Sequence, residues 1–126
     1  MPQNNAGIRP VVLVVEDEAL VRWQAVAMIE EAGFEVIEAT GADEAIAILE
    51  QQADIRLVFT DIQMPGSIDG LRLAHLVRTR WPPVHVIVTS GEIRPGADDL
   101  PKAGRYIAKP YAGSDLAGTM WELMGE

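Results

Sequence analysis

Five short apolar runs, most of them rich in Val and Ile, alternate along this chain with segments that have helical spacing. The runs lack the regular polar alternation of a strand with one solvated face, so we expect strands that are buried on both sides. This alternation constrains the fold more than any other feature of the sequence. The predicted strands are residues 11–15, 35–39, 57–60, 84–89 and 105–108.

Apolar side chains at helical intervals predict a helix in each connection but one. Residues 19–32 form the first helix, which ends before a glycine, a common C-terminal residue. A second helix is expected to begin at Thr40, whose hydroxyl would cap the following amides while Asp43 lies three residues on. The third helix, residues 71–80, ends at a Trp-Pro-Pro sequence because proline has no N–H to donate. The last helix begins after Ser114.

Alternating strands and helices predict an α/β fold, a doubly wound parallel sheet with helices on both faces. The 126 residues contain no repeat and no interdomain linker, which favours a single domain with a core over about residues 10–124 and a polar tail over residues 1–9. In such folds ligands bind beyond the carboxyl ends of the strands. The functional site is therefore expected in the loops that follow the strands.

The charge balance excludes several functions. Ten Lys and Arg residues against nineteen Asp and Glu residues give a formal net charge of -9. This charge repels phosphate backbones and anionic lipids, so neither nucleic acid nor a membrane is an expected partner. The chain has no Cys, which excludes disulfides and a cysteine nucleophile. We expect a cytoplasmic protein, because no apolar run near the start is long enough for a signal or membrane segment.

Polar and charged side chains follow four of the predicted strands. They are Glu16, Asp17 and Glu18 after the first strand, Asp61 after the third, Ser90 after the fourth, and Lys109 and Pro110 after the fifth. Two carboxylates about 4 Å apart repel by about 4 kcal/mol at an effective dielectric near 20. Such crowding needs compensating charge, which a lysine and a hard cation such as Mg²⁺ supply. The pattern predicts a magnesium and phosphoryl site.

Four motifs extend this pattern: VLVVEDE (residues 12–18), VFTDIQMPG (58–66), VIVTSG (86–91) and YIAKPY (106–111). With these motifs the chain resembles the receiver domain of bacterial two-component response regulators, of the chemotaxis-regulator type, over nearly all of residues 11–120. The resemblance implies a flavodoxin-like sheet of five strands in the order 2-1-3-4-5. It also implies a signalling domain, whose only chemistry is its own phosphorylation and dephosphorylation, rather than an enzyme.

The resemblance implies that Asp61 accepts a phosphoryl group from the phosphohistidine of a sensor histidine kinase or of a histidine phosphotransfer protein. Mg²⁺, or Mn²⁺ in its place, would be bound by Asp17, Asp61 and the backbone carbonyl of Gln63. Glu16 would orient a water molecule bound to that ion. Phosphorylation would alter a protein-binding surface, so a downstream protein target is a second expected partner.

The resemblance also assigns roles after the fourth and fifth strands. Ser90 and Lys109 would contact the phosphoryl oxygens, and Ser90 together with Tyr106 would form the switch. The peptide bond between Lys109 and Pro110 is expected to be cis, a state that proline makes accessible.

Three features depart from the family pattern. Glu16 stands where Asp is commoner, and the loop over residues 64–70 has one additional residue, which predicts a rearranged loop. The stretch over residues 90–109 is short and contains Pro95 and Pro101, so the fourth helix of the family is expected to be short, displaced or absent. The usual dimer of the family cannot be assumed, and we expect a monomer or a weak dimer.

Other functional classes compete with this interpretation. The chain could be the receiver part of a hybrid histidine kinase, or a pseudo-receiver that binds proteins without phosphorylation. A flavin-binding electron carrier is disfavoured because Glu16, Asp17 and Glu18 would repel the flavin phosphate. A phosphatase that resembles haloacid dehalogenases would need an acid at the position of Gln63.

Overall fold

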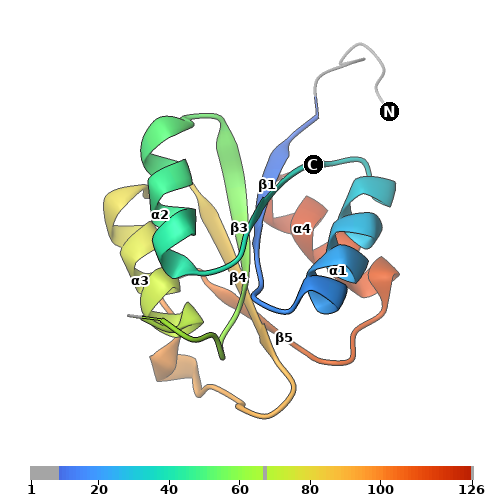
Figure 1. Cartoon of the computed structure of the whole chain (residues 1–126). Helices are drawn as coiled ribbons and strands as arrows, with labels where there is room; N and C mark the ends of the chain where they lie inside the picture. The colour runs from blue at the N-terminus through green and yellow to red at the C-terminus, as the bar shows by residue number, and fades with distance from the viewer. Residues whose placement is uncertain (1–8, 67, 126) are drawn as a thin grey trace.

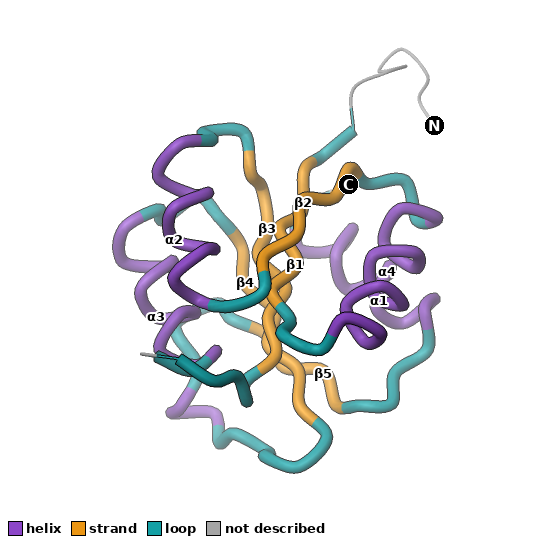
Figure 2. Tube along the Cα trace, viewed as in Figure 1, coloured by secondary structure: helices purple, strands orange, loops and turns teal. Residues whose placement is uncertain are grey.

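The computed structural model describes residues 9–66 and 68–125, and its centre is one parallel sheet of five strands. The strand order is β2-β1-β3-β4-β5, as the family resemblance implies. Figure 2 shows the strands (orange) between the helices (purple). Three strands have the predicted bounds, whereas the other two are displaced or extended by one or two residues. The strands are β1 (Val11–Val15), β2 (Glu35–Ala39), β3 (Ile55–Asp61), β4 (His85–Ser90) and β5 (Arg105–Ala108).

Helices cover both faces of the sheet, which confirms the predicted doubly wound fold (Figure 1). One face carries α1 (Ala19–Glu31) and α4 (Gly113–Leu123), and the other carries α2 (Ala42–Gln51) and α3 (Gly70–Arg80). Parallel strands need these crossovers because the chain must return to the starting end of the sheet before the next strand begins. All carboxyl ends of the strands therefore lie at one edge.

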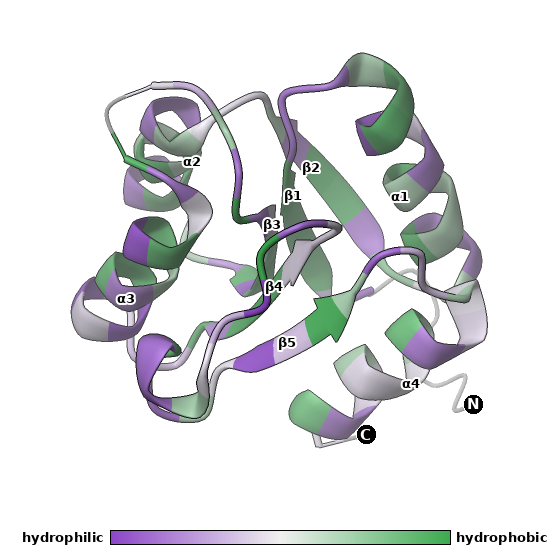
Figure 3. Cartoon of the chain, turned by 90° about the horizontal axis from the view of Figure 1, so that it is seen from below, coloured by the Kyte–Doolittle hydropathy of each residue, from purple (hydrophilic) through white to green (hydrophobic). Residues whose placement is uncertain are grey.

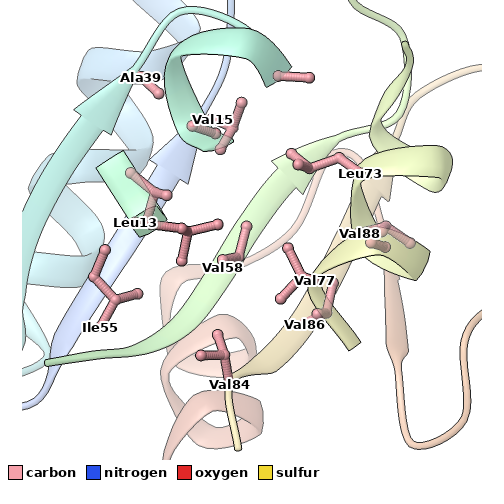
Figure 4. Close-up of a cluster of buried hydrophobic side chains, with 14 of the residues drawn as sticks. Leu13, Val15, Ala39, Ile55, Val58, Leu73, Val77, Val84, Val86 and Val88 are labelled. Carbon is pink, nitrogen blue, oxygen red and sulfur yellow. The ribbon is translucent and has the colours of Figure 1, made fainter. Parts of the chain in front are cut away.

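The core consists of two apolar layers, one on each face of the sheet. All five residues of β1 are buried, and successive side chains point to opposite faces. Leu13 and Val15 pack with Val58 and Val86 beneath α2 and α3, as Figure 4 shows. Val12 belongs to the layer beneath α1 and α4. The strand ends that bear the candidate site therefore extend from a well-packed interior.

The start of α2 differs from the prediction. Gly41 is the N-cap residue, and the helix begins at Ala42 rather than at Thr40. Thr40 donates from its backbone N–H to Glu44 Oε1 at 2.8 Å and from its hydroxyl to the same oxygen at 2.9 Å. The predicted helix cap was therefore wrong. The Thr40 hydroxyl donates a hydrogen bond to the Glu44 side chain instead of accepting one from the helix amides.

The connection between β4 and β5 contains no α-helix, which confirms the expectation for the fourth helix of the family. Only a short 3₁₀ turn, η2 (Ala97–Asp99), interrupts the loop. The Gly96 N–H donates to Asp99 Oδ2 at 2.8 Å, and His75 Nε2 lies 2.7 Å from the Asp99 carbonyl oxygen. The second contact ties this loop to α3. The label α4 consequently belongs to the C-terminal helix.

Some expectations fall outside the described residues. The predicted polar tail lies there except for Arg9, and so does Ser67 within the loop over residues 64–70. Across residues 9–66 and 68–125, none of the helices is both long and apolar enough to pass through a lipid bilayer.

Candidate functional site

Four of the predicted site residues lie where neighbouring strands end. Asp61 is the last residue of β3 and Ser90 is the last of β4, while Glu16 follows β1 and Lys109 follows β5. Figure 3 views the molecule from the side at which the strands end, where apolar strands lead into loops with hydrophilic segments. The parallel topology thus brings these residues to one edge of the sheet.

Lys109 lies between two buried carboxylates. Its Nζ donates to Asp61 Oδ2 at 2.7 Å and is 3.5 Å from Glu16 Oε1. The side chains of Glu16 and Asp61 are only 6% and 10% exposed. Ion pairs that are this shielded from water are weakly screened by salt. Of the three acids expected to converge, Glu16 and Asp61 lie together against Lys109.

The acidic residues remain crowded despite the lysine. Burial, followed by the contact with Asp61 and its charge, raises the pKa of Glu16 from 4.5 to about 7, although the Glu18 N–H and Lys109 oppose this shift. For Lys109, partial burial favours the neutral amine, but the hydrogen bond to Asp61 and the charges of both acids outweigh it and raise the pKa. A further positive charge beside Glu16 and Asp61 would therefore stabilise the ionised form of Glu16.

The backbone N–H, the carbonyl and the side chain of Glu16 each form a hydrogen bond. Its backbone N–H donates to the Ala39 carbonyl at 3.0 Å, and its Oε2 accepts from the Glu18 N–H at 3.2 Å. Its own carbonyl accepts from Arg22 Nη1 at 2.9 Å. Sequence reasoning missed Arg22. The available signal was a basic residue on the first helix, four residues after the acidic motif ends at Glu18.

Asp17 and Gln63 lie at the exposed rim of the site. Within the part of the chain that the structure describes, the Asp17 carboxylate has no hydrogen bond or ion pair. The Gln63 N–H donates to Asp61 Oδ1 at 3.1 Å. The structure therefore brings Glu16 and Asp61 together and leaves Asp17 open to solvent.

The donor set of the site fits a hard divalent cation. Among residues 9–66 and 68–125, no three side chains of His, Cys, Asp or Glu are grouped closely enough to hold a metal ion. Mg²⁺ does not require such a cage, because it binds through one or two carboxylates and keeps several waters. Burial and the contact with Asp61 raise the pKa of Glu16, and a cation beside the two acids would favour the ionised carboxylate.

Ser90 and Tyr106 contact the same loop. Ser90 Oγ accepts from the N–H groups of Glu92 and Ile93 at 3.2 and 2.9 Å. The Tyr106 hydroxyl lies 3.2 Å from the Ser90 carbonyl oxygen and 3.3 Å from the Ile93 carbonyl oxygen. A phenol has one proton, so it donates to only one of these oxygens at a time. The carbonyl of Ile93 was not predicted as part of this arrangement.

The end of β5 is fixed beside Ser90. The Lys109 N–H donates to the Ser90 carbonyl at 3.1 Å. The peptide bond between Lys109 and Pro110 is cis, as predicted.

Gly70, a residue that sequence reasoning missed, brings α3 against the site. A Cβ atom at this position would lie 1.9 Å from the Asp61 carbonyl oxygen and 2.9 Å from the Ile62 Cα. The Gly70 N–H donates to the Ile62 carbonyl at 2.9 Å. The absence of a side chain at Gly70 thus permits the close approach. The Asp-Gly pair that begins the third helix was the available signal.

The sequence of this chain matches a known protein family. The response regulator receiver domain model matches residues 12–120. The sensor kinase CckA of Brucella abortus is 32% identical over 117 residues, which cover 90% of this chain and 12% of CckA. The phosphate regulon transcriptional regulatory protein PhoB of Escherichia coli is 32% identical over 123 residues, which cover 90% of this chain and 51% of PhoB.

Solved structures show the same relationship. The response regulator receiver protein from Pseudomonas putida has a TM-score of 0.76 and 31% identity, and the match covers 95% of this chain and 98% of that chain. A receiver protein from Sinorhizobium medicae has a TM-score of 0.87 at 24% identity, over 94% and 96% of the two chains, and shows the fold alone. The chain spans about an eighth of CckA and about half of PhoB. With the strand order and the matched residues taken together, this chain belongs to the response regulator receiver domain family.

Proposed function

We propose that this chain is a phospho-accepting receiver domain in which Asp61 takes a phosphoryl group from a phosphohistidine. The donor would be a sensor histidine kinase or a histidine phosphotransfer protein. One observation carries the proposal: Lys109 Nζ lies 2.7 Å from Asp61 Oδ2 at the buried end of β3, with Glu16 beside the pair. Phosphoryl transfer depends mainly on positioning and charge stabilisation, and this arrangement supplies both.

The transfer balances as a displacement at phosphorus. An oxygen of Asp61 forms the new P–O bond while the P–N bond of the phosphohistidine breaks, and the bonding pair stays on the imidazole nitrogen. Lys109 offsets negative charge on the phosphoryl oxygens because its ammonium already lies against the attacking carboxylate. The product is an acyl phosphate on Asp61.

A divalent cation, Mg²⁺ or Mn²⁺, fits the remaining part of the site. Glu16, Asp17, Asp61 and the Gln63 carbonyl would hold it, with Glu16 acting through a bound water. When bound, the ion neutralises charge on the carboxylates and on the phosphoryl group. Of the two acids in the β1–α1 turn, Asp17 is exposed and Glu16 is buried.

Ser90 links the acyl phosphate to the loop after β4. Its hydroxyl accepts from Glu92 and Ile93, and its proton remains available to a phosphoryl oxygen. Movement of Ser90 toward that oxygen would carry these amides with it and change the carbonyl contacts of Tyr106. Phosphorylation would shift the population between two loop arrangements only by the difference in their contacts.

The proposal covers a signalling domain whose partners are proteins. Receiver domains as a family receive phosphoryl groups from histidine kinases and act on downstream targets. The similarity to the sensor kinase CckA supports the alternative that this chain is the receiver part of a hybrid kinase. Either arrangement uses the same chemistry at Asp61.

The test is phosphorylation by acetyl phosphate in the presence of Mg²⁺, read by intact-protein mass spectrometry. We expect the mass of one phosphoryl group to be gained by the wild-type chain and by Asp69→Asn, and to be absent from Asp61→Asn. Asp69 is a matched control because it is an exposed acid whose side chain caps α3, and Asn preserves that cap. If the wild-type chain gains no mass with several phosphoryl donors, a pseudo-receiver is the better interpretation.

A further inference from the structure

Arg22 joins three parts of the chain behind the acidic pair. From the fourth residue of α1, its Nη1 donates to the Glu16 carbonyl at 2.9 Å and its Nε donates to Glu38 Oε1 on β2 at 3.0 Å. The Arg22 side chain is 17% exposed, whereas that of Glu38 is 51% exposed. The guanidinium group uses two of its donors in fixed directions, which an ammonium group cannot do.

The contact to the Glu16 carbonyl completes the fixation of the β1–α1 turn. The Glu16 N–H is bonded to Ala39 and its Oε2 is bonded to the Glu18 N–H. Without the Arg22 side chain, the Glu16 carbonyl would lose its charged donor, whereas the Glu16 N–H and the two backbone contacts of Glu18 would keep their partners. The direction of Glu16, and of Asp17 next to it, depends on this peptide.

We propose that Arg22 is a positioning residue that fixes the β1–α1 turn and thereby sets the affinity of the site for Mg²⁺. This inference rests on the proposed function. Groups that orient metal ligands typically change metal affinity 10–100-fold when they are removed. The Arg22 side chain bonds the Glu16 backbone carbonyl and Glu38 rather than a side chain of the site, so its effect would pass through Glu16 and Asp17.

The direction in which Mg²⁺ affinity changes when Arg22 is replaced distinguishes a positioning role from a purely electrostatic one. Arg22 is a cation near a cation site, so by Coulomb repulsion alone its removal would tighten Mg²⁺ binding. Positioning predicts the opposite result. The variant Arg22→Met removes both the charge and the hydrogen bonds, and it keeps much of the apolar stem.

Mg²⁺ binding is measured by calorimetric titration of the folded variants. We expect the Kd of Arg22→Met to rise at least about tenfold, and that of Arg22→Lys to lie between wild type and Arg22→Met. Glu38→Gln retains the carbonyl contact and is expected to bind as wild type does. Arg80→Met is the matched control, because Arg80 forms a 2.9 Å ion pair with Glu50 that involves none of the site residues.

A second readout needs no metal. In EDTA, the Glu18 amide is expected to exchange faster with deuterium in Arg22→Met than in Arg80→Met, because its acceptor is the Glu16 side chain. Unchanged Glu18 exchange, or unchanged or tighter Mg²⁺ binding in Arg22→Met, overturns the inference even when wild type is phosphorylated. A wild-type chain that is not phosphorylated by acetyl phosphate overturns the proposed function instead, together with the inference that rests on it.

Discussion

Glu16 is the residue at which burial and charge are most in conflict. Its side chain is 6% exposed, lies against Asp61, and has a pKa of about 7. The neighbouring Lys109 compensates only part of this cost, since its shorter contact is with Asp61 rather than with Glu16. A carboxyl group in this position favours a proton when no divalent cation is present.

This conflict predicts a pH dependence of stability in EDTA. Because the pKa of Glu16 is above its ordinary value of 4.5, the folded chain binds more protons than the unfolded chain between pH 4.5 and about 7. The protonated Glu16 side chain contributes its full stabilisation below pH 4.5. The free energy of unfolding then falls by roughly 3 kcal/mol as the pH rises from 4.5 through 7. Urea unfolding of wild type and Glu16→Gln at several pH values measures it. Equal slopes for the two proteins over this range would contradict the assignment.

The helix α3 and the strand β3 meet more closely at Gly70 than a side chain at that position would allow. A Cβ atom at Gly70, 1.9 Å from the Asp61 carbonyl oxygen, could not be accommodated by a side-chain rotation, because the obstacle is backbone. The N-terminus of α3 and the end of β3 must therefore move together. Asp61 is positioned partly by this contact.

We predict that Gly70→Ala is destabilising by about 3 kcal/mol, as expected for an overpacked site. Gly118→Ala is the control, because Gly118 is an exposed residue within α4 with nothing within 4 Å of its Cβ position. That substitution is expected to stabilise the chain by about 0.5–1 kcal/mol. Denaturant unfolding of both variants gives the comparison. A Gly70→Ala variant as stable as wild type would show that the backbone separates at little cost.

The bounds of a strand or helix could be predicted where the local pattern of apolar and polar residues defines them. β1, β2 and β5 have the predicted bounds, but β3 begins at Ile55 rather than at residue 57. Arg56 interrupts its apolar run, and the pairing with β1 shifts register beside it, between Val11 and Val12. Such a pairing depends on a partner strand that is distant in sequence. The start of α2 was missed for a similar reason, since Glu44 competes for Thr40.

The protein combines a buried apolar interior with a strongly negative net charge. Two buried layers hold the sheet from both sides, and the formal net charge is -9. Carboxylates that are gathered at one edge of such a molecule gain stability from a bound cation. The coupling between the site and global stability follows from mass action.

We therefore predict that Mg²⁺ raises the melting temperature. At a free concentration 100-fold above Kd, a ligand that binds only the folded chain adds about 2.7 kcal/mol of stability. Thermal unfolding in EDTA and in excess Mg²⁺ measures this gain, and Asp61→Asn is expected to reduce it. Identical wild-type melting curves in the two buffers would argue against a cation at this edge.

The succession of strands and helices, the two-sided burial, and the acid, hydroxyl and lysine residues at the strand ends could all be deduced from the chain alone. These features follow from periodicity and residue type among sequence neighbours. Three contacts required the folded molecule: that of Arg22 with Glu16, that of Gly70 with Asp61, and that of the Tyr106 hydroxyl with the Ile93 carbonyl. Each depends on the direction of a side chain or a backbone group in space, which packing across separate elements decides.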